Sequence, residues 1–140
     1  MNMRTTILLF LYLLPAVALA DYVQYEFGSY RDKVRLEYTE DTLNFIRLAG
    51  GNEFPLCSKD ISSKTLPHSL DVFKELGVES WKNNYFVEDR LDGITFSFKV
   101  KAVSFDKSVV GHADIAPKGY KKLVKYFNEV LLVNGCDKFI

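Results

Sequence analysis

The chain has 140 residues with 18 basic and 18 acidic side chains, so its formal charge at pH 7 is zero. Hydrophobic residues make up 48% and aromatic residues 14% of the chain, which excludes a disordered protein and predicts a domain with a buried core. The charge balance lacks the basic excess that nucleic-acid-binding proteins carry, so we expect no nucleic-acid partner.

Residues 1–20 have the layout of a secretory signal peptide. Arg4 supplies a positive charge, an apolar run follows over 7–14, and Ala18-Leu19-Ala20 matches the pattern of a cleavage site. The apolar run is much shorter than the roughly 20 residues of a membrane-spanning helix, which predicts cleavage and no transmembrane anchor in the mature chain. We therefore expect residues 21–140 to be secreted across the inner membrane into the periplasm, with the extracellular space as the alternative.

Alternating side chains predict an antiparallel meander at the start of the mature chain. Apolar and polar residues alternate over 23–27 and over 33–38, and a third strand is predicted over 42–48. The glycine-containing stretch 49–52 then ends the meander. Residues 53–64 carry a proline and show no alternation, so we expect a loop there.

A first helix is predicted to begin with Thr65 or Ser62 near its cap and to end before Gly77, a residue suited to a left-handed C-cap. Pro67 fits its first turn, where a missing N–H does no harm. Three apolar residues of this helix are predicted to face the core, namely Leu70, Phe73 and Leu76. Apolar residues over 78–89 recur at neither helical nor strand spacing, so the sequence predicts no secondary structure for this segment.

The Asp92-Gly93 turn precedes the strand with the strictest alternation in the chain. Its core-facing side chains are predicted to be Ile94, Phe96, Phe98 and Val100, beneath the last helix. Another strand is predicted over 103–113, with an interruption near 106–108. The last helix is predicted over 117–133, because apolar residues recur there at helical spacing.

This order of elements predicts one α+β domain over 21–140: a single antiparallel sheet of about five strands with two helices packed on one face. The chain contains two cysteines, Cys57 and Cys136. In an exported protein such a pair predicts one disulfide. Neither cysteine lies in a Cys-x-x-Cys motif, so we interpret the bridge as structural.

Part of the chain follows a pattern of ordered landmarks: an aromatic residue before a loop, an Asp-Gly that opens a strand of alternating aromatics, a glycine, a proline and a closing amphipathic helix. These landmarks are Trp81, Asp92-Gly93, Phe96, Phe98, Gly111, Pro117 and the helix from Tyr120. In this respect residues 81–132 resemble a loose group of small exported bacterial α+β domains of uncharacterised function. The segment 111–117 is longer than in that pattern. The resemblance implies the fold and a bacterial envelope setting, and it assigns no catalytic residue.

No motif in the sequence predicts a catalytic, cofactor-binding or metal site. Metal sites draw on several closely spaced ligands, and the nearest approach is His112 with Asp114; we interpret His112 as a surface or loop histidine. The sequence has no Gly-x-Ser-x-Gly motif of a serine hydrolase. The acidic cluster 88–92 is interpreted as a solvated hairpin turn rather than as a pair of glycosidase carboxylates.

Two groups of residues are candidates for binding a partner. Four lysines fall on one face of the last helix: Lys118, Lys121, Lys122 and Lys125. Such a face is usually only solvated, and an acidic partner or an anionic envelope surface is the alternative. The second group is Trp81, Tyr85 and Asp89, whose aromatic members belong either to the core or to an interface.

These observations predict a small periplasmic protein that is not an enzyme, needs no cofactor and binds another protein. The most specific version is an inhibitor or immunity-type protein directed against an envelope-targeting toxin or hydrolase. One alternative is an envelope module that binds a small ligand or a glycan. The other is a small hydrolase whose site a single sequence does not reveal.

Overall fold

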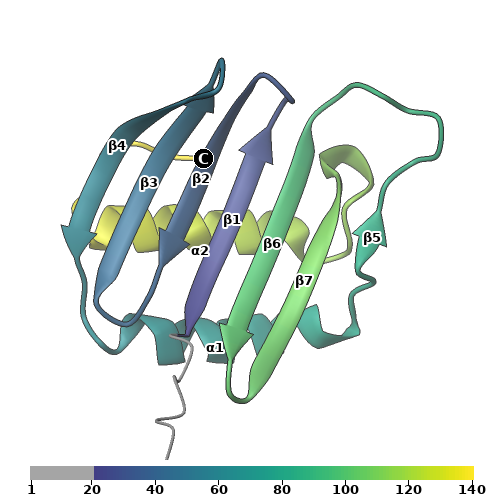
Figure 1. Ribbon diagram of the computed structural model, residues 1–140. Coiled ribbons are helices and arrows are strands. Elements are labelled where there is room, and N and C mark those ends of the chain that lie inside the picture. The colour runs from purple at the N-terminus through teal and green to yellow at the C-terminus, as the bar shows by residue number, and fades with distance from the viewer. Residues whose placement is uncertain (1–20) are drawn as a thin grey trace, which may run out of the picture.

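A computed structural model describes residues 21–140, and the predicted signal peptide lies outside the described residues. These residues form one seven-stranded sheet with two helices behind it (Figure 1). The strands are β1 (Tyr22–Gly28), β2 (Asp32–Tyr38), β3 (Thr42–Ala49), β4 (Asn52–Asp60), β5 (Asn84–Tyr85), β6 (Thr95–Ala102) and β7 (Phe105–His112). The helices are α1 (Thr65–Glu75) and α2 (Tyr120–Val133), with the short 3-10 turns η1 (Val78–Ser80) and η2 (Ala113–Ile115).

The prediction of about five antiparallel strands is wrong. The strand order across the sheet is β4-β3-β2-β1-β6-β7-β5, and β5 runs parallel to β7, so the sheet is mixed. The other neighbouring strands pair antiparallel. An α+β domain with both helices on one face is observed as expected (Figure 1).

The two strands that the sequence did not predict are the edges of the sheet. The loop predicted over 53–64 is wrong because β4 occupies most of it. Most β4 side chains are exposed, so the apolar alternation of a half-buried strand is missing. Pro55 is tolerated because β4 is an edge strand with a bulge, where the register shifts between Phe45 and Ile46 of β3. The other edge strand, β5, has two residues.

The core lies between the helices and the facing side of the sheet. Phe98 of β6 is at its centre and is fully buried. Its ring centroid lies 5.1 Å from that of Phe73 on α1 and 5.8 Å from that of Phe127 on α2. Tyr25 of β1 pairs with Phe98 in the sheet and contacts the same Phe127 ring, at 5.0 Å. Aromatic side chains from both layers therefore hold the helices on the sheet.

The predicted burial of Ile94 is wrong, whereas Phe96, Phe98 and Val100 are buried as predicted. Ile94 is 44% exposed because β6 begins one residue later. It follows Gly93, whose φ of 112° turns the chain into the strand.

Three further sequence predictions differ from the structure. β7 has no interruption, since each of its residues pairs with β6. α2 begins at Tyr120, three residues after Pro117, because Gly119 at the N-cap adopts a left-handed φ of 94°. The cluster 88–92 does not form a hairpin turn, since β5 and β6 are not neighbours: β7 lies between them.

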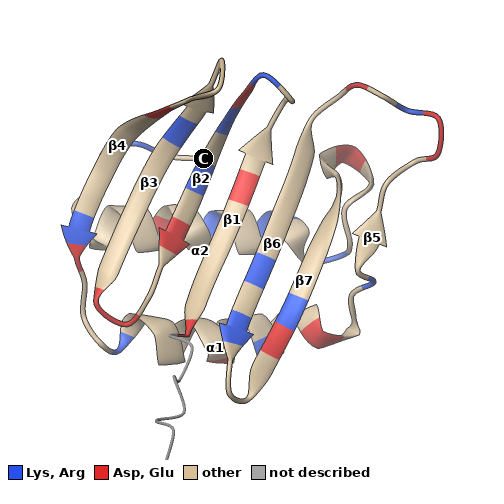
Figure 2. Cartoon of the chain, viewed as in Figure 1, with Lys and Arg blue, Asp and Glu red and all other residues tan. Residues whose placement is uncertain are grey.

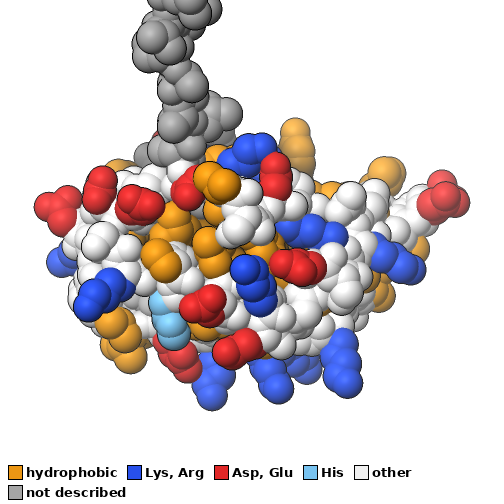
Figure 3. Space-filling view, turned by 90° about the horizontal axis from the view of Figure 1, so that it is seen from below, with side chains coloured by type: hydrophobic (Ala, Val, Ile, Leu, Met, Phe, Trp, Pro, Cys, Tyr) orange, Lys and Arg blue, Asp and Glu red, His pale blue; other side chains and the backbone are white. Residues whose placement is uncertain are grey.

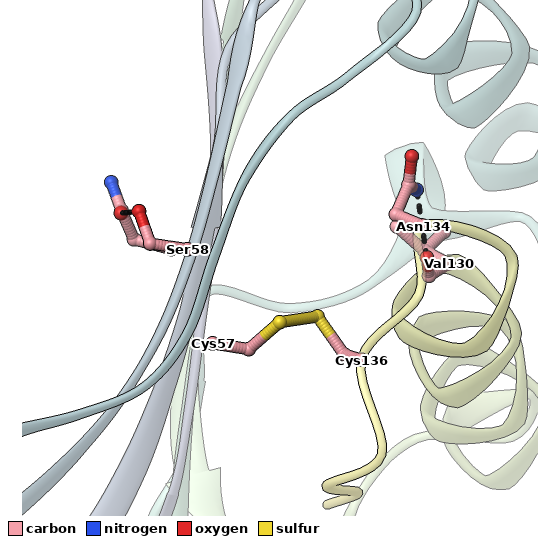
Figure 4. The surroundings of a disulfide bond; sticks show 6 residues. Cys57, Ser58, Val130, Asn134 and Cys136 are labelled. Atoms are coloured by element: carbon pink, nitrogen blue, oxygen red, sulfur yellow. Dashed lines mark hydrogen bonds between the residues drawn. A yellow bond between two sulfur atoms is a disulfide. The ribbon is translucent and has the colours of Figure 1, made fainter.

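The predicted disulfide between Cys57 and Cys136 is present (Figure 4). Cys57 points from β4 toward the helix layer, whereas the adjacent Ser58 points to the other side of the sheet. The chain leaves α2 through Asn134, which donates a side-chain hydrogen bond of 2.8 Å to the carbonyl oxygen of Val130. The bridge therefore fastens the end of the chain to the edge strand β4.

Within residues 21–140, no second layer covers the face of the sheet opposite the helices (Figure 1). Charged residues of both signs lie along its strands (Figure 2). Near its centre the carboxylate of Glu26 accepts hydrogen bonds from Lys33 at 3.0 Å and from Arg35 at 2.7 Å. No helix within residues 21–140 has the length and apolar character needed to cross a membrane.

Candidate functional site

Most of the predicted partner-binding residues lie where the end of α1, the turn η1 and the start of α2 meet. A hollow of about 630 Å³ opens there, which we call the α2 hollow. Its lining includes the aromatic candidates Trp81 and Tyr85 and the basic candidates Lys118 and Lys122. The remaining lining residues are Glu75, Leu76, Ser80, Pro117 and Gly119. The fold thus brings together aromatic and basic candidates more than 30 positions apart in the sequence.

Trp81 belongs to the core and also lines the α2 hollow. Its side chain is 6% exposed, and its ring centroid lies 6.5 Å from that of Phe98. The Lys107 ammonium of β7 donates hydrogen bonds to the carbonyl oxygens of Glu79 and Trp81. These bonds hold the segment around η1 against the edge of β7, so the tryptophan forms a fixed wall of the hollow.

Tyr85 is half-buried and reaches the hollow because β5 lies unusually close to β7. A Cβ atom at Gly111 of β7 would lie 2.5 Å from the Cβ of Tyr85 and 2.8 Å from its carbonyl carbon. Only glycine permits that approach. The Tyr85 hydroxyl accepts a hydrogen bond of 2.9 Å from the backbone N–H of Lys82, which orients the ring.

The exposed face of α2 and the residue before its N-cap carry what we call the lysine row: Lys118, Lys121, Lys122 and Lys125. The prediction that all four lie on the helix is wrong for Lys118, because α2 begins only at Tyr120. All four side chains are exposed. No salt bridge within residues 21–140 involves any of them. Basic side chains project from the helix side of the molecule when it is viewed from the α1 end (Figure 3). The lysine row is therefore a positive surface that starts at the α2 hollow, where Glu75 is the acidic lining residue, and continues along the helix.

Asp89 does not join this group. It lies on the segment 86–93 between β5 and β6, where its φ of 62° is left-handed, and it does not line the α2 hollow. Of the seven candidate residues, four line the hollow, Lys121 and Lys125 extend the positive surface beyond it, and Asp89 lies apart.

Comparison with known proteins adds no assignment to this geometry. The chain matches no family model and no curated protein. In the described part of the chain, no three or more His, Cys, Asp or Glu side chains cluster in a way that could hold a metal ion. The α2 hollow is thus characterised by its own aromatic wall and positive rim.

The interpretation of His112 as a surface or loop histidine is wrong. Its side chain, at the end of β7, is 2% exposed. Its Nδ1 atom accepts a hydrogen bond of 3.1 Å from the backbone N–H of Val87, and the ring packs edge-on against Phe86 at a centroid distance of 5.0 Å. The segment 86–93 packs over the histidine. This burial comes from residues distant in the sequence, so the pattern around His112 does not indicate it.

Asp114 does not form a ligand pair with His112. Its carboxylate accepts hydrogen bonds from Nη1 of Arg90 at 2.9 and 3.1 Å. The Arg90 guanidinium, first through this hydrogen bonding and then through its charge, lowers the pKa of the Asp114 carboxyl below its usual value. The bonds from Val87 and Arg90 therefore join the segment 86–93 to the end of β7 and the start of η2.

Proposed function

We propose that this protein is exported and acts without catalysis, by binding another protein. In the most specific form of this proposal it is an inhibitor or immunity-type protein that blocks an envelope-targeting toxin or hydrolase in the periplasm. The partner meets the α2 hollow and the lysine row and presents an acidic surface to them.

The observation that carries this proposal is the position of the lysine row beside an aromatic-walled hollow. Lys118 and Lys122 line the hollow, whereas Lys121 and Lys125 lie outside it on the same face of α2 as Lys122. A small ligand in the hollow would leave Lys121 and Lys125 without a role, but a macromolecular surface can contact the whole row. Unpaired surface charges of one sign raise the encounter rate with an oppositely charged partner and favour its orientation.

The disulfide supports the same proposal. Cys57–Cys136 fixes the C-terminal end of α2 to β4, and the aromatic core fixes the rest of the helix to the sheet. A surface on a fixed helix loses little conformational entropy when a partner binds.

The proposal is tested by capturing partners from an envelope extract with the immobilised mature protein and measuring binding kinetics with the captured protein. We expect the double variant Lys121→Glu/Lys125→Glu to associate more slowly, most clearly at low salt, because these rim charges steer encounter. Its melting temperature should stay nearly unchanged, since both side chains are exposed and without a salt bridge in the described chain.

The matched control is Lys64→Glu/Lys99→Glu, which makes the same charge change at two exposed lysines outside the lysine row. We expect this control to retain most of the association rate. If both double variants slowed association equally, the change in net charge alone would explain the slower association. That result would refute the lysine row as the binding surface. A captured protein whose binding is insensitive to the lysine-row variant would refute it as well.

A further inference from the structure

A second hollow, separate from the α2 hollow, lies beside the turn between β1 and β2. Its volume is about 420 Å³, and it is bounded by that turn, by the segment 86–93 and by the ends of β6 and β7. We call it the His112 hollow. The lining side chains that matter chemically are Arg31, Lys33, Arg90, Asp92, Thr95 and His112.

His112 presents a hydrogen-bond donor to this hollow. The neutral imidazole ring has one N–H, and Nδ1 is the acceptor for the N–H of Val87, so Nε2 carries the hydrogen. The only side-chain hydrogen bond of His112 within residues 21–140 is the one that Nδ1 accepts. No buried side-chain nitrogen or oxygen in this range lacks a partner, so Nε2 keeps contact with the open space of the hollow. Since the histidine is 2% exposed and lines the hollow, a ligand there is the natural acceptor for this N–H.

The charged groups around the hollow are mainly donors. Arg90 uses Nη1 for Asp114, and its Nε and Nη2 have no hydrogen-bond acceptor within the described residues. Arg31 forms no salt bridge in the same range, and Lys33 shares the carboxylate of Glu26 with Arg35. Asp92 is the one carboxylate in the lining. Thr95 donates to the carbonyl oxygen of Gly28 at 3.3 Å, so its hydrogen is already used.

We propose that the His112 hollow binds a small organic ligand through an oxyanion group, either a carboxylate or a phosphate. The oxyanion accepts from His112 Nε2 and is neutralised by the guanidinium groups of Arg31 and Arg90, whose planar forks suit such groups. The hollow has room for about a dozen water-sized groups, which corresponds to a single sugar ring with its substituents. This site does not depend on the α2 hollow or on a protein partner.

The test is an NMR titration of the mature protein at constant ionic strength, with the ring nitrogens of His112 and the Arg90 Nε–H as reporters. The probes are glucuronate, glucose 6-phosphate and neutral glucose, which share one ring and differ in the anionic group. We expect a saturable shift at His112 with glucuronate or glucose 6-phosphate and none with glucose. The tighter of the two anions identifies the oxyanion as a carboxylate or a phosphate.

Two variants show whether the shift comes from this hollow. Arg31→Gln removes an exposed cation that makes no salt bridge in the described chain, so the fold should be kept, and we expect the anion affinity to fall about tenfold. The control Lys125→Gln, outside the lining, should leave the affinity unchanged. An absence of saturation with both anions, an equal response to glucose, or an unchanged affinity in Arg31→Gln would overturn the proposal.

Discussion

The hydroxyl oxygens of Tyr38 on β2 and Ser69 on α1 lie 2.8 Å apart in the core. Ser69 directs its single hydrogen to the carbonyl oxygen of Thr65, also at 2.8 Å. Tyr38 must therefore donate to Ser69, and so must Tyr126 of α2, whose hydroxyl lies 2.7 Å from the same oxygen. One serine oxygen thus satisfies polar groups from the sheet and from both helices. Its loss should affect all three elements.

The first prediction concerns this hydroxyl group. Ser69→Ala should lower the free energy of unfolding by about 1–3 kcal/mol, because fully buried Tyr38 loses its acceptor. Urea denaturation measures the change. In the Ser69→Ala background, Tyr38→Phe should cost much less than in the wild type, since the hydroxyl it removes has no partner left. Strictly additive effects of the two substitutions would contradict this hydrogen-bond arrangement.

The second prediction concerns acid stability and Glu26. Partial burial raises the pKa of this carboxyl, but the hydrogen bonds and charges of Arg35 and Lys33 outweigh that effect, so its pKa in the folded protein lies below the ordinary value of 4.5. The folded state therefore gains stability from ionised Glu26 above the unfolded-state pKa. This contribution is lost as the pH falls through the lowered pKa of the folded state.

Glu26→Gln should remove this part of the pH dependence and should also destabilise the protein at pH 7, since two half-buried cations lose their shared carboxylate. Urea unfolding between pH 3 and 7 measures both effects. Glu37→Gln is the matched control, because Glu37 lies on β2, beside β1 in the sheet, and forms no salt bridge within residues 21–140. An equal change in pH dependence for the two variants would show that the cluster around Glu26 contributes nothing specific.

The third prediction separates the two ends of the alternating strand. Phe98→Ala should cost about 3–5 kcal/mol, the range for truncating a buried aromatic side chain. Ile94→Ala should cost much less, because Ile94 precedes β6 and is largely solvated. Thermal and urea denaturation of both variants measure the contrast. A larger loss for Ile94→Ala than for Phe98→Ala would mean that the strand begins earlier and presents its other face to the helices.

The elements predicted from the sequence are those whose pattern is local. β1, β2, β3 and β6 alternate because one face is buried, and α2 shows apolar residues at helical spacing for the same reason. The edge strands lack such a pattern. β4 is mostly exposed, and β5 exists only because Asn84 meets Val110, a contact between distant parts of the chain.

The candidate sites follow the same division. Most of the lysine row was predictable because Lys121, Lys122 and Lys125 share a face of α2, which Lys118 precedes. The α2 hollow was not, since it requires Trp81 and Tyr85 to lie beside the start of α2. The burial of His112 was not predictable either, because it depends on coverage by the segment 86–93, whose path no local periodicity specifies.

The fourth prediction concerns export and the disulfide. Protein recovered from the periplasm should begin at Asp21, if the signal peptide is cleaved as its sequence predicts. It should contain no free thiol, because Cys57 and Cys136 are bonded. Intact mass and thiol titration in denaturant measure both properties. Two titratable thiols in unreduced periplasmic protein would contradict the bridge.

Loss of the bridge should mainly stabilise the unfolded state. The cysteines are 79 residues apart, and loop entropy alone then gives an upper value of about 4.5 kcal/mol for the stabilisation. Cys57→Ser/Cys136→Ser should therefore unfold at lower urea than the wild type. Reduced wild type serves as the control, because it lacks the bridge but keeps both sulfur atoms, and it should match the double variant closely. Unchanged stability in both would show that the tie between α2 and β4 adds nothing to the fold.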